Sequence, residues 1–309
     1  MGAVAFVFPG QGSQSVGMGR AMAAAFPEAR AALETMDAAL GEPLSKILEE
    51  GPLEDLTLTR NAQPAILATS VAVLRAIEAR GALRPAVVAG HSLGEYSALV
   101  AAGALDLADA IRLTRRRGDL MQSAVPAGTG AMAAVMGVDR STLEAVCADA
   151  AQGEVVAPAN FNAPGQIVIA GHRAAVERAS AAVAAKGGKA IPLKVSAPFH
   201  CALMRPAAEG LAAALETVRI VAPRVPVVSN VSAEPTTDPG RIRELLVRQV
   251  DGAVRWEESV QRLVAMGVGT VVEVGPGKVL QGLVKRIDKS VRVVGVETPD
   301  DLDKLGEIA

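Results

Sequence analysis

One short stretch of the sequence has the residue types of a nucleophile held on a sharp turn. Residues 90–94 read Gly-His-Ser-Leu-Gly, which matches G-x-S-x-G, and they stand between a β-branched run and an alanine-rich run. Such a corner needs small residues on both sides, because larger side chains would collide across it. It would expose the Ser92 hydroxyl near a helix N-terminus, where backbone N–H groups favour a developing negative charge. We interpret Ser92 as a nucleophile rather than part of an ordinary glycine-containing turn.

A serine nucleophile needs a base, and the chain has only three histidines. His91 precedes Ser92, and neighbouring side chains on an extended strand point to opposite faces, so it is a poor acceptor for the serine proton. His172 is interpreted as a surface or helix-start residue. His200 lies in "SAPFHCALM", where the chain returns to the larger of two domains and would face the cleft between them. We therefore predict His200 as the base; the alternative is a buried structural histidine.

A helix predicted over Leu107–Met121 carries a second chemical signal. At 100° per residue, one face holds three arginines and an aspartate, as a solvated basic face would, whereas Arg117 falls among the apolar residues. A buried guanidinium needs an anionic partner, because burying the charge alone costs several kcal/mol. The partner is either an internal Asp or Glu or a substrate carboxylate, and periodicity does not choose between them. Gly118, directly after it, could end or loosen the helix.

The glycine-rich loop "FPGQGSQSVGMG" at 8–19 raises the question of a phosphate site. Ser15 stands where G-x-G-x-x-G needs its third glycine, and Met18 replaces the lysine of a phosphate loop. Nucleotide binding is therefore not predicted, and the loop needs another explanation.

Composition excludes several classes of function. The net charge is −2 and aromatic residues make up 2% of the chain, which leaves little for binding nucleic acid. No apolar run approaches the roughly 20 residues of a membrane span, and the first apolar run is too short for a signal peptide. The two cysteines, Cys147 and Cys201, have no metal-ligand spacing. We expect a cytoplasmic protein that binds no nucleic acid, membrane or metal.

The order of predicted elements indicates two parts. Strands at 4–10, 85–90, 225–231 and 270–277 alternate with helices at 18–40, 63–79, 107–121, 203–215, 242–248 and 257–266, which favours an α/β fold with a mainly parallel sheet. Between them, residues 130–196 read β-α-β-β-α-β, the order of a ferredoxin-like unit. We predict a hydrolase-like large domain of residues 1–125 and 199–309 and an inserted ferredoxin-like subdomain of residues 126–198.

An ordinary α/β-hydrolase is a weaker interpretation. Its triad runs serine, acid, histidine along the chain with the histidine late, yet the last 109 residues hold no histidine and no H-G-G-G-like loop occurs. A serine esterase or thioesterase using the same elbow stays as the alternative function. A non-catalytic scaffold is the third possibility.

The chain as a whole resembles the malonyl-CoA:acyl carrier protein transacylases of fatty-acid synthesis. The motifs that carry the resemblance run in order through nearly the whole chain: "FPGQGSQ" at 8–14, "GHSLGEYSAL" at 90–99, "RRRGDLMQ" at 115–122, "NFNAPGQIVIAG" at 160–171, "PFHCALM" at 198–204, "LVRQ" at 246–249 and "EVGPGK" at 273–278. Their joint occurrence is far more specific than the elbow pattern alone. The family's fold, a hydrolase-like core with a ferredoxin-like subdomain, agrees with the order of elements.

The resemblance implies roles for the reacting residues. Ser92 would match the acyl-accepting serine, His200 the base, and Arg117 the arginine that binds the malonyl carboxylate. Phe199 resembles the residue found beside the histidine in malonyl-selective domains, where its bulk would crowd a methyl branch; plain core packing is the other explanation.

The resemblance also implies a set of backbone groups. The N–H groups of Gln11 and Leu93 would form the oxyanion hole, and the main-chain carbonyl of Gln249 would orient the histidine. The glycines around Gln11 would then serve the close approach of this loop to the Ser92 corner.

The reaction implied is ping-pong transfer of malonyl from malonyl-CoA to the phosphopantetheine thiol of acyl carrier protein, in fatty-acid or polyketide synthesis. No metal or redox cofactor is required, and we expect a monomer. The carrier proteins of this pathway are acidic, so Lys189, Lys194, Lys285 and Arg286 are candidate docking residues, unless they are scattered solubilising charges.

Overall fold

The structure, a computed structural model, describes residues 2–81 and 83–308, so that residues 1, 82 and 309 lie outside the described part. The strands are β1 (Ala3–Phe8), β2 (Val87–Gly90), β3 (Gly130–Met136), β4 (Val156–Ala163), β5 (Gln166–His172), β6 (Lys189–Pro192), β7 (Val227–Val228), β8 (Pro235–Thr236), β9 (Val268–Val274) and β10 (Arg292–Val296). The α-helices are α1 (Arg20–Ala25), α2 (Pro27–Leu40), α3 (Leu44–Glu50), α4 (Leu53–Thr57), α5 (Thr59–Ala79), α6 (Gly94–Ala101), α7 (Leu107–Ser123), α8 (Arg140–Ala151), α9 (Arg173–Ala185), α10 (Arg205–Glu216), α11 (Pro239–Asp251), α12 (Trp256–Ala265) and α13 (Val279–Ile287). Two 3₁₀ helices are η1 (Ala202–Met204) and η2 (Pro299–Glu307).

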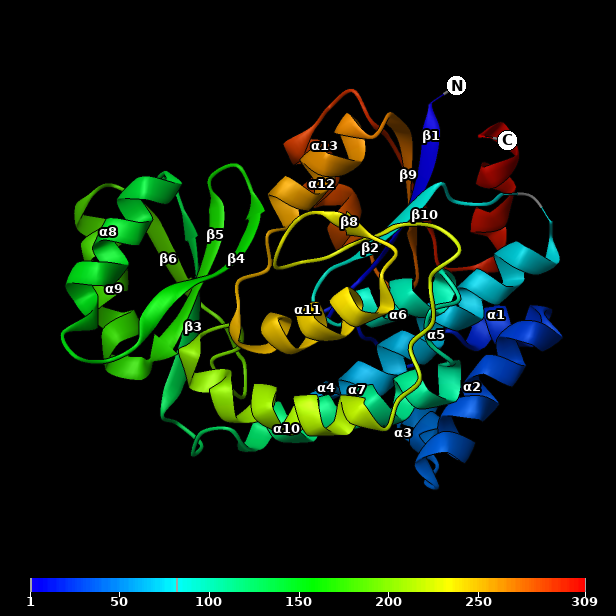
Figure 1. The fold of residues 1–309 in the computed structure, drawn as a ribbon, viewed down its shortest axis with the longest axis horizontal. Coiled ribbons are helices and arrows are strands. Elements are labelled where there is room, and N and C mark those ends of the chain that lie inside the picture. The colour runs from blue at the N-terminus through cyan, green and yellow to red at the C-terminus, as the bar shows by residue number, and fades with distance from the viewer. Residues whose placement is uncertain (1, 82, 309) are drawn as a thin grey trace.

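The larger sheet is a six-stranded, mainly parallel sheet with the order β10-β9-β1-β2-β7-β8, in which only the β7–β8 pair is antiparallel. Its central strand β1 is buried on both faces: Phe6 and Phe8 join one core cluster, while Ala5 and Val7 join another that includes α12 and α13 residues. This burial on two faces is what a parallel sheet covered by helices requires. The predicted fold class is confirmed (Figure 1).

The register of the parallel strands brings three loops together. Phe8 pairs with Gly90, and Ala89 pairs with Val228, so β1, β2 and β7 end at the same edge of the sheet. Ligands of open α/β sheets bind outside the carboxyl ends of the strands. The loops after these three strands contain Gln11, Ser92 and Asn230.

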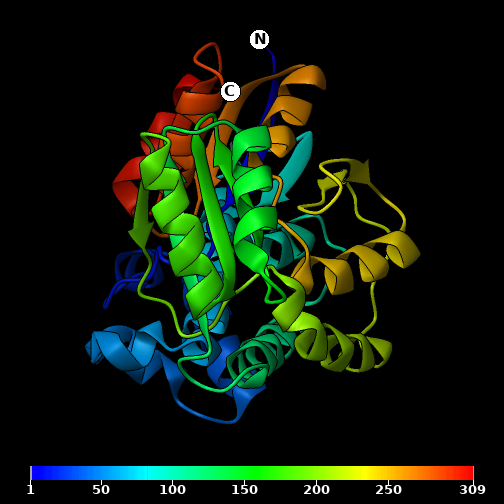
Figure 2. The ribbon, with the colours of Figure 1, turned by 90° about the vertical axis from the view of Figure 1, so that its left-hand side faces the viewer.

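The second sheet has four antiparallel strands in the order β4-β5-β3-β6. Helices α8 and α9 cover its outer face, as Figure 2 shows, and the sheet turns its other face toward the large domain. This is the ferredoxin-like arrangement predicted for the middle of the chain. The boundaries at 125/126 and 198/199 stay a prediction.

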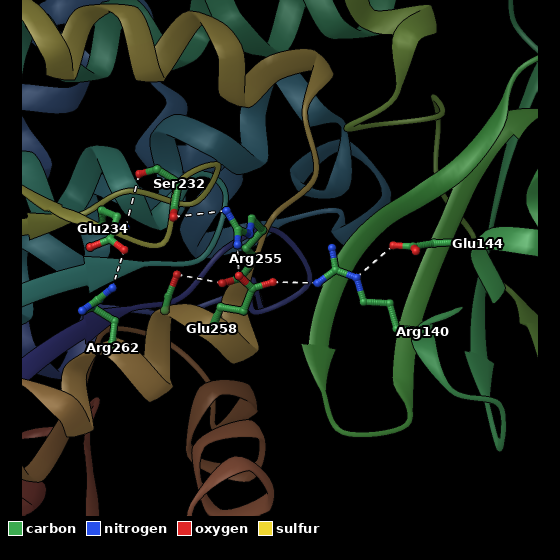
Figure 3. Close-up of polar contacts among 8 residues, drawn as sticks. Arg140, Glu144, Ser232, Glu234, Arg255, Glu258 and Arg262 are labelled. Atoms are coloured by element: carbon green, nitrogen blue, oxygen red, sulfur yellow. Dashed lines mark hydrogen bonds and ion pairs between the residues drawn. The ribbon is translucent and has the colours of Figure 1, made fainter. Parts of the chain in front are cut away.

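Backbone and side-chain contacts join the smaller sheet and its helix α8 to the segment around α12 of the large domain. Phe161 N–H donates to the Val254 carbonyl at 2.8 Å, and Val254 N–H donates to the Ala159 carbonyl at 2.9 Å. Beside them, Arg140 of α8 pairs with Glu258 of α12 at 2.7 Å, and Glu258 also contacts Arg255 (Figure 3). The smaller sheet is therefore fixed against the large domain.

Several sequence predictions are corrected. The helix predicted over 18–40 is two helices, because Pro27 restricts Phe26 to an extended conformation (φ −130°, ψ 118°) that breaks the run. The strand predicted over 225–231 pairs only at Val227 and Val228. The helix predicted from Gln63 begins at Thr59, and α3, α4, α13 and β10 were not predicted. Within residues 2–81 and 83–308, no helix combines the length and apolar composition needed to cross a membrane.

Candidate active site

Ser92 lies on a strained corner between β2 and α6. Its φ of 50° is in the left-handed region, which costs a non-glycine residue about 1–3 kcal/mol. A Cβ on Gly90 would lie 1.9 Å from the Gly94 carbonyl carbon, and one on Gly94 would lie 2.0 Å from the Phe8 carbonyl oxygen. Only glycine fits at either position, so these two glycines allow the corner that presents the hydroxyl.

His200 is in hydrogen-bond contact with Ser92. Its Nε2 lies 2.7 Å from Ser92 Oγ, and its Nδ1 lies 2.8 Å from the main-chain carbonyl oxygen of Gln249. A carbonyl can only accept, so Nδ1 carries the proton of the neutral ring and Nε2 is free to accept from Oγ–H. His200 also has a left-handed φ, of 59°, so both partners sit on strained backbone. The contact has the geometry of a serine and its general base.

Arg117 is buried, with 2% of its surface exposed, and its guanidinium points at the same serine. Nη2 donates to Ser92 Oγ at 3.1 Å and to Gln249 Oε1 at 2.9 Å, and Nη1 donates to Gln63 Oε1 at 2.7 Å. The ring of Tyr96 lies 5.5 Å from the guanidinium carbon. The sequence left two possible partners for Arg117, an internal Asp or Glu or a substrate carboxylate. No carboxylate in the described residues forms a salt bridge with Arg117, so the internal ion pair is not found.

Burial controls the proton affinities of these groups. Desolvation, followed by the positive charge of Arg117, lowers the pKa of His200 to about 3, so its imidazole is neutral at physiological pH. Burial also lowers the pKa of Arg117, yet a guanidinium stays charged in proteins. The site therefore holds a neutral base and a buried cation side by side.

Gln11, in the loop after β1, and Leu93, the N-cap of α6, both line the cavity that contains Ser92. Within residues 2–81 and 83–308, the backbone N–H of neither residue donates to a protein acceptor. Gly10 packs directly on the corner, since a Cβ there would lie 2.5 Å from the His91 carbonyl oxygen. The Gln11 side chain turns away to Thr59 Oγ1, at 3.2 Å. Two unpaired donors near a nucleophile are what an oxyanion hole provides.

A cavity of about 200 Å³ contains the site. It is lined by Gln11, Gln63, Ser92, Leu93, Arg117, Met132, Asn160, Lys194, Phe199 and His200, among others. Phe199 is thus both buried and at the cavity wall. Larger hollows of about 530 and 830 Å³ lie elsewhere and hold neither Ser92 nor His200.

The side chains of the other two histidines bond groups other than Ser92, although His91 also lines the cavity. His91 Nε2 is 2.8 Å from Asn162 Oδ1, and its ring meets Trp256 edge-on at 5.6 Å between centroids. His172 begins α9, and its Nδ1 accepts the Val155 N–H at 2.9 Å.

Two predictions about α7 were wrong. Arg115, placed with the solvated arginines, is buried, because its guanidinium bonds Asn61 Oδ1 at 2.7 Å and pairs with Glu42. Gly118 does not end the helix, which runs on to Ser123. A Cβ on Gly118 would lie 2.7 Å from the Arg60 Cα, so the glycine instead allows α7 to pack closely on α5.

Three residues of the hydrogen-bond network around the site were missed from the sequence: Gln63, Glu95 and Asn230. Asn230 Oδ1 accepts the Ser92 N–H at 2.6 Å, and its Nδ2 donates to the Gly90 carbonyl at 2.6 Å. These two hydrogen bonds hold the backbone of the corner on both sides of His91. The sequence signal for Asn230 was its place as a polar residue at the end of a predicted strand of the parallel sheet, where ligand sites of such sheets lie. Glu95 gave a signal too, since it is a carboxylate directly after the elbow motif.

Comparisons with known proteins support a family assignment. The acyl transferase domain family matches residues 5–304. The malonyl CoA-acyl carrier protein transacylase of Escherichia coli K12 is 52% identical over 296 residues, 96% of each chain, and that of Bacillus subtilis is 48% identical over 98% of this chain and 96% of its own.

Solved structures agree in fold. An acyl carrier protein S-malonyltransferase from Vibrio cholerae has a TM-score of 0.96 at 50% identity, over 98% of this chain and 99% of that one. A malonyl-transacylase solved in complex with a type II PKS acyl-carrier protein has a TM-score of 0.97 at 47% identity, over 99% of this chain and all of that one. The chain belongs to the malonyl CoA-acyl carrier protein transacylase family of acyltransferases.

Proposed function

We propose that this protein transfers malonyl groups from malonyl-CoA to the phosphopantetheine thiol of acyl carrier protein through a malonyl ester of Ser92. One observation carries the proposal: Ser92 Oγ lies 2.7 Å from a neutral imidazole and 3.1 Å from a buried guanidinium. Nucleophile, base and carboxylate receptor therefore meet at one oxygen. The names of the relatives support the same activity, which supplies fatty-acid or polyketide synthesis.

The first half-reaction acylates the serine. His200 Nε2 takes the proton from Ser92 Oγ as this oxygen attacks the thioester carbonyl, and the N–H groups of Gln11 and Leu93 hold the resulting oxyanion. Loss of one such donor costs about 100- to 1000-fold in kcat in comparable enzymes. When the intermediate collapses, His200 returns the proton to the departing thiolate, and CoA leaves as the free thiol.

The second half-reaction repeats these steps in reverse. His200 accepts the proton of the phosphopantetheine thiol, whose sulfur attacks the malonyl ester, and the released Ser92 alkoxide regains a proton from His200. Proton transfer and charge stabilisation are enough for acyl exchange, so we infer that neither a metal nor a redox cofactor takes part.

Arg117 selects the acyl group. No carboxylate in the described part of the chain contacts Arg117 directly, so a malonyl carboxylate can form the direct ion pair that this guanidinium lacks. A neutral acetyl group leaves the buried guanidinium unpaired, and the site disfavours it for that reason. Phe199 at the cavity wall adds bulk against a methyl branch.

The carrier protein would approach the exposed segment at the mouth of the cavity. Leu193, Lys194 and Val195 are exposed and line the cavity, which leaves apolar and basic surface open there. Lys189, Lys285 and Arg286 are also exposed, and we keep them as docking candidates for an acidic partner. We infer that the protein works as a monomer in the cytoplasm.

Mass spectrometry of the acyl-enzyme tests the proposal. Incubation with malonyl-CoA should add one malonyl group to Ser92, and the Ser92→Ala variant should gain none. Added carrier protein should remove the group and become malonylated. Rapid release of CoA by water without carrier protein would favour a serine esterase or thioesterase instead, and absence of any adduct would favour a non-catalytic role.

A further inference from the structure

Glu95 is a buried carboxylate directly after the elbow, and the reaction steps above do not use it. It stands in the first turn of α6, next to Gly94, and 3% of its surface is exposed. Its Oε2 accepts the Asn230 N–H at 3.1 Å and a Gln249 Nε2–H at 2.7 Å. A buried carboxylate with only neutral donors around it is costly, so its retention next to the nucleophile calls for a reason.

Gln249 links Glu95 to three residues of the site, Ser92, Arg117 and His200. Its Nε2 also donates to the Ser92 carbonyl oxygen at 2.9 Å, its Oε1 accepts from Arg117, and its main-chain oxygen accepts from His200. An ionised carboxylate can only accept, and a guanidinium can only donate. Glu95 on one side and Arg117 on the other therefore allow a single orientation of the Gln249 amide.

Glu95 is also the charge that balances Arg117 in the free enzyme. Arg117 bonds only neutral groups directly, namely Gln63, Gln249 and Ser92. The carboxylate of Glu95 acts on it through one intervening amide, and the attraction between the two charges is mutual. A substrate carboxylate on Arg117 would bring a second negative charge into the same buried space.

We propose that Glu95 is a positioning and specificity-determining residue: ionised, it fixes the Gln249 amide and neutralises Arg117 until the substrate carboxylate arrives, and it then competes with that carboxylate. The inference rests on the proposed function, in which Arg117 binds malonyl. By linkage, protonation of Glu95 and binding of a carboxylate on Arg117 must favour each other.

The direction of the pH effect follows from the groups around Glu95. Burial raises the pKa of Glu95 to about 7, against the opposing hydrogen bonds from Asn230 and Gln249 and the charge of Arg117. Of the titratable groups nearby, burial holds Tyr96 protonated, with a pKa raised to about 12, and His200 neutral. Arg117 stays charged. Between pH values of about 6 and 8.5, Glu95 therefore changes charge while these neighbours do not, and malonyl selectivity should fall as the pH rises.

Binding to a protein that cannot react measures this selectivity. In Ser92→Ala, the Kd values of malonyl-CoA and acetyl-CoA are measured by calorimetry at about pH 6 and about pH 8.5. The acetyl/malonyl ratio of Kd values cancels titration of the CoA phosphates, which both ligands share. We expect the ratio to drop about fivefold or more with rising pH, at the lower end of ordinary coupling between sites. In Ser92→Ala/Glu95→Gln, the ratio should stay at its low-pH value throughout, because glutamine keeps an acceptor oxygen and has no charge.

Glu273 provides the matched control. It is also buried and also accepts two N–H groups, those of Leu280 and Gln281, but within the described residues it forms no hydrogen bond with a residue of the site. Ser92→Ala/Glu273→Gln should keep the pH dependence of Ser92→Ala. A ratio that favours malonyl equally at both pH values in Ser92→Ala would overturn the role of Glu95, whether or not the Glu95 variant folds. A ratio near one at both pH values would instead overturn the carboxylate site on Arg117, and with it the proposed function.

Discussion

Arg117 and Ser92 are in direct contact: a guanidinium N–H donates to the nucleophilic oxygen across 3.1 Å. In a malonyl thioester, a single methylene separates the carboxylate from the carbonyl that the serine attacks. A receptor for that carboxylate must therefore lie within a few ångströms of the nucleophile. Carboxylate and nucleophile cannot both hold the guanidinium in the same way, so substrate binding should release Oγ to His200.

Replacement of Arg117 by alanine should change the acyl specificity. We expect malonyl transfer to fall by about 100-fold or more, because the substrate carboxylate would be buried without a partner. Acetyl transfer should be retained or increased. Steady-state transfer from each CoA ester to carrier protein measures both. Arg116→Ala, one residue away on the exposed face of α7, is the control and should transfer malonyl at the normal rate. Undiminished malonyl transfer by Arg117→Ala would contradict the assignment.

The same substitution should alter the proton affinity of the base. Burial comes first among the causes that lower the pKa of His200 to about 3, and the charge of Arg117 comes second. Removing that charge should raise the pKa of His200, while burial keeps it below the ordinary value of about 6.5. Nuclear magnetic resonance titration of the ring measures the change, with the ring signals of His172 on the other sheet as an internal reference. A pKa of His200 unchanged by Arg117→Ala would mean that the two groups are screened from each other.

The backbone packs so tightly around Gly94 that a larger residue there should destabilise the protein. Alanine at Gly94 would put a Cβ 2.0 Å from a backbone oxygen of β1, which cannot move without shifting the central strand. We expect Gly94→Ala to lower the free energy of unfolding by about 3 kcal/mol or more, the upper range for overpacking. Gly282 in α13 has open space around its Cβ position, so Gly282→Ala should raise stability by about 0.5–1 kcal/mol. Chemical denaturation compares the two, and equal effects would contradict the geometry.

The sequence predicted the parts of the site that depend on local pattern. Gly90 and Gly94 predicted the sharp turn that presents Ser92, and the helical period placed Arg117 on a buried face. The fold class followed from alternating strands and helices. Each of these depends on residues close together in the chain.

The features of the site that could not be predicted depend on contacts between residues far apart in the chain. Arg115 follows the solvated pattern of its helix, yet Glu42 and Asn61, more than 50 residues away, draw it into a buried position. Asn230 and Glu95 are 135 residues apart, and only the register of β2 and β7 brings them together. Residues of this kind are visible in sequence only as polar side chains at strand ends, which is too weak a signal to assign a role.

The ion pair between Arg140 of α8 and Glu258 of α12 should contribute little to stability. Arg140 and Glu258 keep 50% and 25% of their side-chain surfaces exposed, and Glu258 retains Arg255 when Arg140 is removed (Figure 3). We therefore expect a double-mutant cycle of Arg140→Ala and Glu258→Ala to give a coupling energy below about 1 kcal/mol, as for exposed pairs. Added salt should reduce it further, because screening acts on charges in contact with water. Denaturation at low and high salt measures the coupling. Arg140→Ala alone should cost more than the coupling, because the guanidinium carbon also lies over the Phe161 ring, 4.0 Å from its centroid, and the variant loses this contact. A salt-independent coupling of several kcal/mol would show that the pair is desolvated and that the ion pair, not the backbone contacts at Val254, holds the smaller sheet in place.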